Sequence, residues 1–172
     1  MGVEHFSANL LETALGNIEQ ALALQPNEPQ FLYNYALVLK NLKRHQDALE
    51  AINKSIALDT QSANSHSLRG NILQELKEFT SAIDCYDKAI ALQADLADTY
   101  NNRAFAYKEL KAFSKATSDF EKVLALDPHY PLALGNLIHI KMLNCDWTGL
   151  DNLLSRLFAE IEEGKNVANP FP

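Results

Sequence analysis

The stretch GNILQELKEFTSAIDCYDKAIAL, residues 70–92, decides the fold because the chain repeats it at a fixed interval. The related stretch ALVLKNLKRHQDALEAINKSIAL lies 34 residues earlier, at residues 36–58. A third copy, AFAYKELKAFSKATSDFEKVLAL, lies 34 residues later, at residues 104–126. Copies at a single period are typical of stacked repeats, in which each unit buries its apolar face on the next. The pattern therefore predicts a repeat solenoid.

Each copy has the pattern of two helices joined by a short turn. In the middle copy Leu68, Ile72 and Leu76 recur at helical spacing, and a second periodic run starts after the turn at Phe79. Small residues recur mid-way along the first helices and early in the second helices: Ala36, Gly70 and Ala104, then Ala48, Ala82 and Ala116. Two helices approach most closely where both contact points are small. We therefore expect antiparallel helix pairs, with Gly70 packed against Ala82 in the middle copy.

The period also divides the rest of the chain. We expect an incomplete first repeat at 1–26 with its second helix at about 10–25, full repeats at 29–62, 63–96 and 97–130, a divergent C-terminal helix pair at 131–163 and an extended tail at 164–172. Pro29 and Pro131 fall where a first helical turn is expected, a position that tolerates proline. Ile138, Leu150 and Leu157 replace small residues of the earlier copies, so the last pair is expected to splay or to end the array.

The positions of small and large residues resemble the tetratricopeptide repeat. The matching residues are Tyr100, Gly70, Tyr107, Ala82, Tyr86, Phe120, Ala89 and Pro128. The resemblance covers residues 10–130. It implies an all-α fold, a superhelical solenoid of antiparallel helix pairs with a concave groove lined by the first helices.

A narrower resemblance concerns residues 101–172. The run NNRAFAYKEL, the tripeptide Cys145-Asp146-Trp147 and the closing Asn169-Pro170-Phe171-Pro172 look like bacterial relatives of the O-linked N-acetylglucosamine transferases. In that family such a helix pair links the last repeats to the glycosyltransferase domain, and this chain stops where that domain would begin. The resemblance implies the substrate- or partner-recruiting arm of such an enzyme. The alternative is a free-standing adaptor or co-chaperone-like scaffold with no associated enzyme.

The composition is that of a folded, acidic protein. Of the 172 residues 47% are hydrophobic and 22% are charged, and the net charge is −7. Nucleic acid and anionic membranes require a basic surface, so neither is expected as the main partner. The N-terminus lacks a secretory signal, and no apolar run reaches the length of a membrane span. We therefore expect a cytoplasmic chain that binds a protein or an extended peptide. The open face of the incomplete first repeat adds self-association as a possibility.

No motif of an enzyme or a metal site occurs in the sequence. It contains no glycine-rich phosphate loop, HExxH, GxSxG or paired-cysteine zinc spacing. We expect a chain that is not an enzyme and that needs no cofactor or metal. His66 stands where other repeats have leucine or tyrosine, so it is expected to pack in the core with a polar partner.

Three further residues are assigned to the core. Cys85 and Cys145 match no metal or redox spacing and are expected to be buried or half-buried, as free cysteines usually are. Trp147 aligns with Phe79 and Phe113, which predicts a core position at the start of a second helix.

The resemblance to tetratricopeptide repeats places a row of carboxamides in the groove. The expected groove residues are Asn34, Asn71, Asn101, Asn102 and Asn136, together with Tyr33, Phe105, Lys40 and Lys108. A carboxamide both donates and accepts hydrogen bonds, so a row of them can hold a peptide backbone whatever its side chains. The alternative is that asparagine is simply common on the surface of such helices and has no binding role here. Leu68 also interrupts the row, because it stands at the repeat position of Asn34 and Asn102.

A carboxylate clamp of the co-chaperone kind is not expected in this groove. Such a clamp requires lysine and arginine side chains that point into the groove. At the matching positions this chain has Tyr33, Leu37, Leu68, Asp98 and Asn102. Arg69 and Arg103 share one repeat position that apolar residues normally occupy, so they are expected to serve in packing between repeats or in salt bridges.

Overall fold

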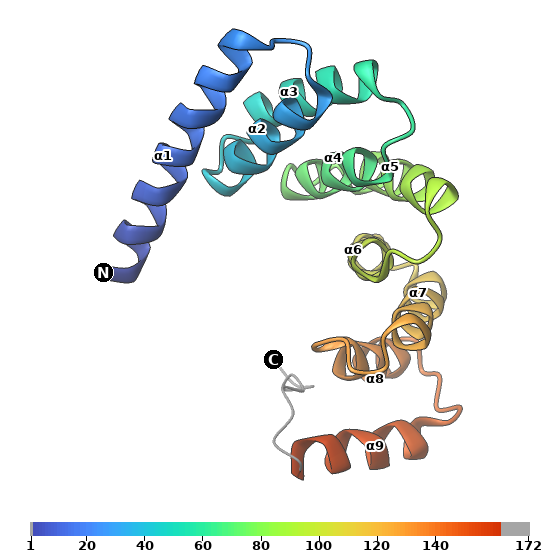
Figure 1. Ribbon diagram of the computed structural model, residues 1–172. Helices are drawn as coiled ribbons and strands as arrows, with labels where there is room; N and C mark the ends of the chain where they lie inside the picture. The colour runs from blue at the N-terminus through green and yellow to red at the C-terminus, as the bar shows by residue number, and fades with distance from the viewer. Residues whose placement is uncertain (1, 163–172) are drawn as a thin grey trace. The chain divides into compact units, whose positions relative to one another are not determined.

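The computed structural model describes the backbone of residues 2–162 and the side chains of residues 9–162. Over residues 2–162 the chain forms nine helices and no strand (Figure 1), which confirms the all-α fold. The chain divides into two compact units, residues 1–93 and 94–172. The predicted tail at 164–172 lies outside the described residues. None of the helices between residues 2 and 162 combines the length and apolarity that a membrane crossing needs.

The first unit holds a single helix followed by two helix pairs. Its helices are α1 (Gly2–Leu24), α2 (Pro29–Asn41), α3 (His45–Leu58), α4 (Ala63–Glu75) and α5 (Phe79–Leu92). The pairs are α2 with α3 and α4 with α5, while α1 packs on α2 and α3 packs on α4. Their shared core includes the fully buried Ala36, Leu39, Ala48, Ile52 and Ile72. As predicted, the small residues lie where the helices meet.

The second unit holds two helix pairs. Its helices are α6 (Ala97–Glu109), α7 (Phe113–Leu126), α8 (Ala133–Leu143) and α9 (Leu150–Glu162). The first pair, α6 and α7, encloses Ala104, Ala116 and Phe120. In the last pair the bulky Ile138, Leu150 and Leu157 form a separate cluster with Leu134, and α8 packs more extensively on α7 than on α9. α8 and α9 pack on each other less extensively than the helices of the earlier pairs, whose contact points are small residues.

The same turn joins the two helices of every pair. Lys43, Lys77, Lys111 and Cys145 all have left-handed backbone angles, with φ of 62°, 65°, 57° and 53°. In each turn the next residue donates its N–H to a carbonyl five residues back, as Arg44 does to Leu39 at 2.9 Å. This bond and the left-handed residue are the features of a helix C-cap that satisfies the last carbonyls. Local geometry therefore repeats with the period of the sequence.

Several helix ends differ from the sequence pattern. α1 begins at Gly2, earlier than residue 10, and α8 begins at Ala133. Leu132 has φ of 68°, so Pro131 does not start the helix as predicted. Pro29, by contrast, is the first residue of α2.

The core assignments of Trp147 and Cys145 were wrong. Trp147 is 63% exposed and Cys145 is also exposed, whereas Cys85 is buried as predicted. In the other pairs the second helix starts two residues after the left-handed residue, but α9 starts only at Leu150. Gly149 has φ of 69°, and the Thr148 N–H donates to Asp146 Oδ1 at 3.0 Å. This additional turn leaves Trp147 outside the helix and facing solvent.

Gly70 is needed because of Tyr86. A Cβ atom at Gly70 would lie 2.7 Å from Cδ1 and 2.9 Å from Cζ of Tyr86, too close for any real contact. The Tyr86 ring is fully buried, and its hydroxyl donates to Asn71 Oδ1 at 2.9 Å and to Gln74 Oε1 at 3.2 Å. The side chain nearest to an added Cβ at Gly70 is therefore that of Tyr86.

Candidate functional site

The candidate site is the surface of the first helices, which we call the first-helix face. In the first unit it comprises Tyr33, Asn34 and Lys40 on α2 and Asn71 on α4, all of them half-buried. Gln30 Nε2 donates to Asn34 Oδ1 at 3.2 Å, one turn apart on α2. The Asn71 carbonyl oxygen accepts the Tyr86 hydroxyl at 2.9 Å, so this carboxamide also supports the helix pair.

Tyr33 lines a small hollow at the N-terminal ends of α2 and α4. The hollow has a volume of about 190 Å³, and its walls include Ser55, Ser62 and Ser65. Ser55 Oγ donates to the Pro29 carbonyl at 2.9 Å, and Ser62 caps α4 by accepting the Ser65 N–H at 3.2 Å. Burial raises the pKa of the Tyr33 phenol, so it stays a hydrogen-bond donor at neutral pH.

In the second unit α6 carries most of the first-helix face. Asn101, Asn102, Phe105 and Lys108 are half-buried on successive turns, and Asn136 is half-buried on α8. Asn101 Nδ2 donates to Asn102 Oδ1 at 3.4 Å. Phe105 packs edge-on against the buried Phe120 with ring centroids 5.5 Å apart, and Lys108 Nζ lies 5.8 Å from the centre of the Phe105 ring. The aromatic ring is therefore held in place beside two carboxamides.

Leu68 does not belong to the first-helix face. It is 3% exposed and packs in the core of the first unit with Ala48 and Ile72. The sequence reasoning placed it on the inner surface because of its repeat position alone.

The repeated arginines are packing residues, as predicted. Arg69 on α4 donates through Nε to Cys85 Sγ at 3.1 Å and through Nη1 to Asn53 Oδ1 at 3.4 Å, so it joins α4 to α5 and α3. Arg103 on α6 donates to both carboxylate oxygens of Asp119 on α7, at 2.8 and 2.6 Å. His66 is likewise buried, with Nε2 3.1 Å from the Thr60 carbonyl oxygen, and burial lowers the pKa of its imidazole.

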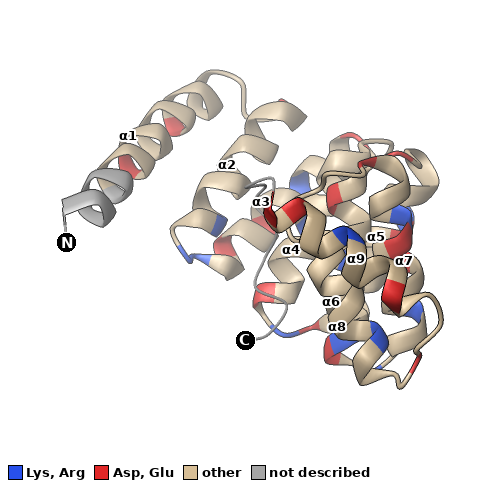
Figure 2. Cartoon of the chain, turned by 90° about the horizontal axis from the view of Figure 1, so that it is seen from below, with Lys and Arg blue, Asp and Glu red and all other residues tan. Residues whose placement is uncertain are grey.

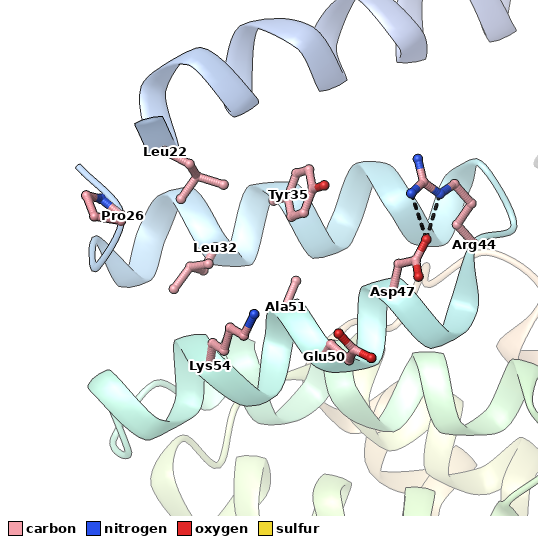
Figure 3. A pocket seen from close by; sticks show the side chains of 9 residues that line it. All are labelled: Leu22, Pro26, Leu32, Tyr35, Arg44, Asp47, Glu50, Ala51 and Lys54. Carbon is pink, nitrogen blue, oxygen red and sulfur yellow. Dashed lines mark hydrogen bonds and ion pairs between the residues drawn. The ribbon is translucent and has the colours of Figure 1, made fainter. Parts of the chain in front are cut away.

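A second hollow, which sequence reasoning missed, lies between α1, α2 and α3 (Figure 3). We call it the α1–α3 groove. Its volume is about 430 Å³, and its lining residues are Leu22, Pro26, Leu32, Tyr35, Arg44, Asp47, Glu50, Ala51 and Lys54. The signal in the sequence was Tyr35, which stands at the repeat position that holds Arg69 and Arg103 in the next two repeats.

The charges of the molecule do not form a metal site in the described part. Among the side chains of residues 9–162 no three histidine, cysteine, aspartate or glutamate groups converge. Figure 2 shows acidic and basic residues along most helices, and α1 carries glutamates but no lysine or arginine. Lys141 Nζ donates to Asp146 Oδ2 at 2.5 Å, and this bond, together with hydrogen bonds from Thr148, lowers the pKa of Asp146 to about 2.

Comparison with family models identifies the repeat. A model described as a TPR repeat matches residues 70–111, and the tetratricopeptide repeat model matches residues 97–130. A model described as anaphase-promoting complex, cyclosome, subunit 3 matches residues 7–89. No curated protein matches the chain significantly in sequence.

Solved structures share the fold at low sequence identity. A crystal structure of MamA matches with a TM-score of 0.82 and 21% identity, over 95% of this chain and 96% of that chain. YrrB, described as a TPR protein with an unusual peptide-binding site, matches with a TM-score of 0.69 and 19% identity, over 87% and 77%. The first TPR of Spaghetti (RPAP3), bound to the HSP90 peptide SRMEEVD, matches with a TM-score of 0.67 and 22% identity, over 68% and 93%.

These likenesses agree with the helix pairs, the turns and the 34-residue period of the chain. The chain therefore has the all-α fold of a tetratricopeptide-repeat solenoid, and the two repeat models match it over residues 70–130.

Proposed function

We propose that the chain is a scaffold that binds a protein segment or an extended peptide on its first-helix face. The observation that carries this proposal is the group on α6, where Asn101, Asn102 and Phe105 are half-buried side by side and Phe105 is held by Phe120. A partly exposed carboxamide offers a donor and an acceptor to a peptide backbone. An aromatic ring that is already fixed loses little conformational entropy when a partner packs on it.

The magnitudes favour weak binding with little sequence preference. A hydrogen bond contributes about 0.5–1.5 kcal/mol, so three carboxamides supply about 2–4 kcal/mol. Micromolar binding requires about 8 kcal/mol, and in the second unit the aromatic side chain of Phe105 would have to contribute much of the remainder. Two structural neighbours support the proposal: one is described with a peptide-binding site, and the other is bound to a peptide.

The test removes two carboxamides in the second unit. The double variant Asn102→Ala/Asn136→Ala should weaken capture on a peptide array several-fold while its melting temperature stays close to that of the wild type. The matched control is Asn27→Ala/Asn152→Ala, which removes two exposed carboxamides away from the first-helix face. If the first variant bound peptides as tightly as the control, the carboxamides would have no part in binding.

We further propose that this scaffold is the substrate- or partner-recruiting arm of an O-linked N-acetylglucosamine transferase-like protein in the cytoplasm. The support is the resemblance of the Cys145-Asp146-Trp147 region, and the exposed Trp147 gives that segment a surface on which a following domain could pack. The alternative is a free-standing adaptor. The gene distinguishes the two: a sugar-nucleotide-binding domain encoded downstream would support the first, and a stop codon directly after Pro172 would contradict it.

We propose self-association through α1 separately, because among the described helices α1 packs mainly on α2. In the described part of α1, Leu10 is 57% exposed. Small-angle scattering over a range of concentrations should show a dimer at the high end, and a monomer throughout would refute it.

A further inference from the structure

The α1–α3 groove has a counterpart in the second unit. A hollow of about 360 Å³ between α7, α8 and α9 is lined by Glu121, Leu124, Ala125, Leu137, Lys141, Thr148, Gly149, Leu153 and Arg156. Five of its lining residues lie three repeat periods, or 102 residues, after a lining residue of the α1–α3 groove. The corresponding residues are Leu22 and Leu124, Tyr35 and Leu137, Asp47 and Gly149, Ala51 and Leu153, and Lys54 and Arg156. The two hollows are therefore the same feature of the repeat.

Arginine occupies the corresponding position in the repeats between them. Arg69 stands one repeat after Tyr35, and its guanidinium group is bonded to Asn53 and to Cys85, the residue that corresponds to Ala51. Arg103 stands one repeat further on and is paired with Asp119, which also corresponds to Ala51. Tyr35 cannot reach across in this way, because its hydroxyl donates to Glu19 on α1 at 3.3 Å. The hollow beside α3 consequently stays open.

The α1–α3 groove has an apolar part and a charged part (Figure 3). Leu22, Leu32 and Ala51 form the apolar part, with room for one aliphatic side chain. At the charged end Arg44 and Asp47 form an exposed ion pair at 2.7 Å, which satisfies the only arginine of the groove. Glu50 is exposed and makes no ion pair with the described residues.

The charge around the groove is negative. Asp47 and Glu50 on α3 are joined by two glutamates of α1. Glu19 accepts the hydrogen bond of the Tyr35 hydroxyl. The pKa of Arg44 is raised mainly by its hydrogen bond to Asp47 and to a smaller extent by the charge of Glu12. Within the lining Arg44 and Lys54 balance Asp47 and Glu50, so the excess negative charge comes from Glu12 and Glu19 on α1, a helix whose sequence has no lysine or arginine. An excess of acidic groups attracts a cationic ligand and repels an anionic one.

We propose that the α1–α3 groove is a second binding site, distinct from the first-helix face, that takes a peptide with an aliphatic side chain flanked by lysine or arginine. The aliphatic side chain fills the space beside Leu22, Leu32 and Ala51, where an arginine lies in the next two repeats. The flanking cation lies at Glu50, whose carboxylate is exposed.

The test uses three capped, fluorescently labelled peptides and fluorescence anisotropy at low salt. One peptide has a central leucine flanked by lysines, the second has glutamates in place of the lysines, and the third has alanine in place of the leucine. The first should bind the wild-type chain at least about tenfold more tightly than either of the others, as expected for one lost charge or side-chain contact. Equal binding of the lysine and glutamate peptides, or no binding of the lysine peptide, would overturn the proposal.

Two variants locate the site. Glu50→Lys reverses an exposed charge and should weaken binding of the lysine peptide about tenfold. Tyr35→Arg/Ala51→Asp recreates the pair seen between Arg103 and Asp119, fills the groove and should abolish binding. If this double variant does not fold, as judged by circular dichroism, Glu50→Lys alone decides.

The result is independent of the first-helix face. Asn102→Ala/Asn136→Ala should keep the preference for the lysine peptide over the glutamate peptide, because binding on the first-helix face has little sequence preference. Binding that survives Glu50→Lys but is lost in Asn102→Ala/Asn136→Ala would overturn the second site and support the proposed function.

Discussion

Replacing Gly70 by alanine should destabilise the first unit, although glycine inside a helix is normally a weakness. In an open helix position this replacement stabilises a protein by about 1 kcal/mol, because alanine has the higher helix propensity. At Gly70 the added methyl group would overlap the Tyr86 ring, with Cδ1 at 2.7 Å and Cζ at 2.9 Å. The ring is fully buried, and its hydroxyl is bonded to two side chains of α4, so it cannot simply move away.

The size of the effect follows from these opposing terms. Forcing extra volume into a packed core costs about 1–3 kcal/mol, and the propensity gain offsets about 1 kcal/mol of this. We therefore expect a net loss of about 1–2 kcal/mol in the free energy of unfolding. Urea denaturation followed by far-ultraviolet circular dichroism measures it, with the slope of the transition checked because stacked repeats need not unfold in one step.

A second substitution tests the cause. Tyr86→Phe removes the hydroxyl that ties the ring to Asn71 and Gln74, so the ring is freer to shift away from an added methyl group. The next repeat already has this combination, with Phe120 and Ala104 in one core cluster. The double variant Gly70→Ala/Tyr86→Phe should then lose less stability than the two single variants added together. If Gly70→Ala alone stabilised the protein by about 1 kcal/mol, the close contact with Tyr86 would be refuted.

Four further predictions follow from single side chains. Burial lowers the pKa of His66, so on acidification the unfolded chain takes up the proton first. The free energy of unfolding should therefore fall as the pH drops below about 6.5. Denaturation curves of His66→Leu at several pH values should lack this dependence. Asp119→Ala removes the carboxylate that pairs with Arg103 in a mostly buried ion pair and should lower the unfolding free energy by up to about 3–5 kcal/mol, whereas replacing both residues by leucine should cost much less. Lys77→Gly should raise the unfolding free energy by about 0.5–1 kcal/mol, because φ is 65° there and glycine adopts it without strain. Trp147→Ala should change the thermal unfolding by no more than about 0.5 kcal/mol, since a larger loss would mean that the side chain is packed.

Much of the fold could be predicted because its signals are local. The apolar period, the small residues and the interval of 34 residues indicate which segments form helices and which helices pair. The packing roles of His66, Arg69 and Arg103 were predicted correctly for the same reason, because apolar residues hold the same repeat positions in other repeats and indicate that these positions are packed. The first-helix face rests on repeat positions too, and Leu68 shows where this reasoning fails: the same position is half-exposed in one repeat and buried in another.

Helix ends and open spaces depended on more distant contacts. Repeat alignment placed Trp147 in the core, but the turn around Asp146 and Gly149 delays the start of α9 and turns the indole to solvent. The start of this helix therefore depends on a local hydrogen bond and a glycine with positive φ, which alignment of the repeats does not reveal.

The sequence by itself therefore determined the class of fold, the pairing of the helices and the role of the repeated arginines, because all three follow from periodicity along the chain. Only the tertiary structure decided that Gly70 makes room for Tyr86 and that the space beside Ala51 stays open. Both depend on how far a side chain reaches across to the next helix. Arg69 bridges that distance, whereas Tyr35 is held by Glu19 on the opposite side.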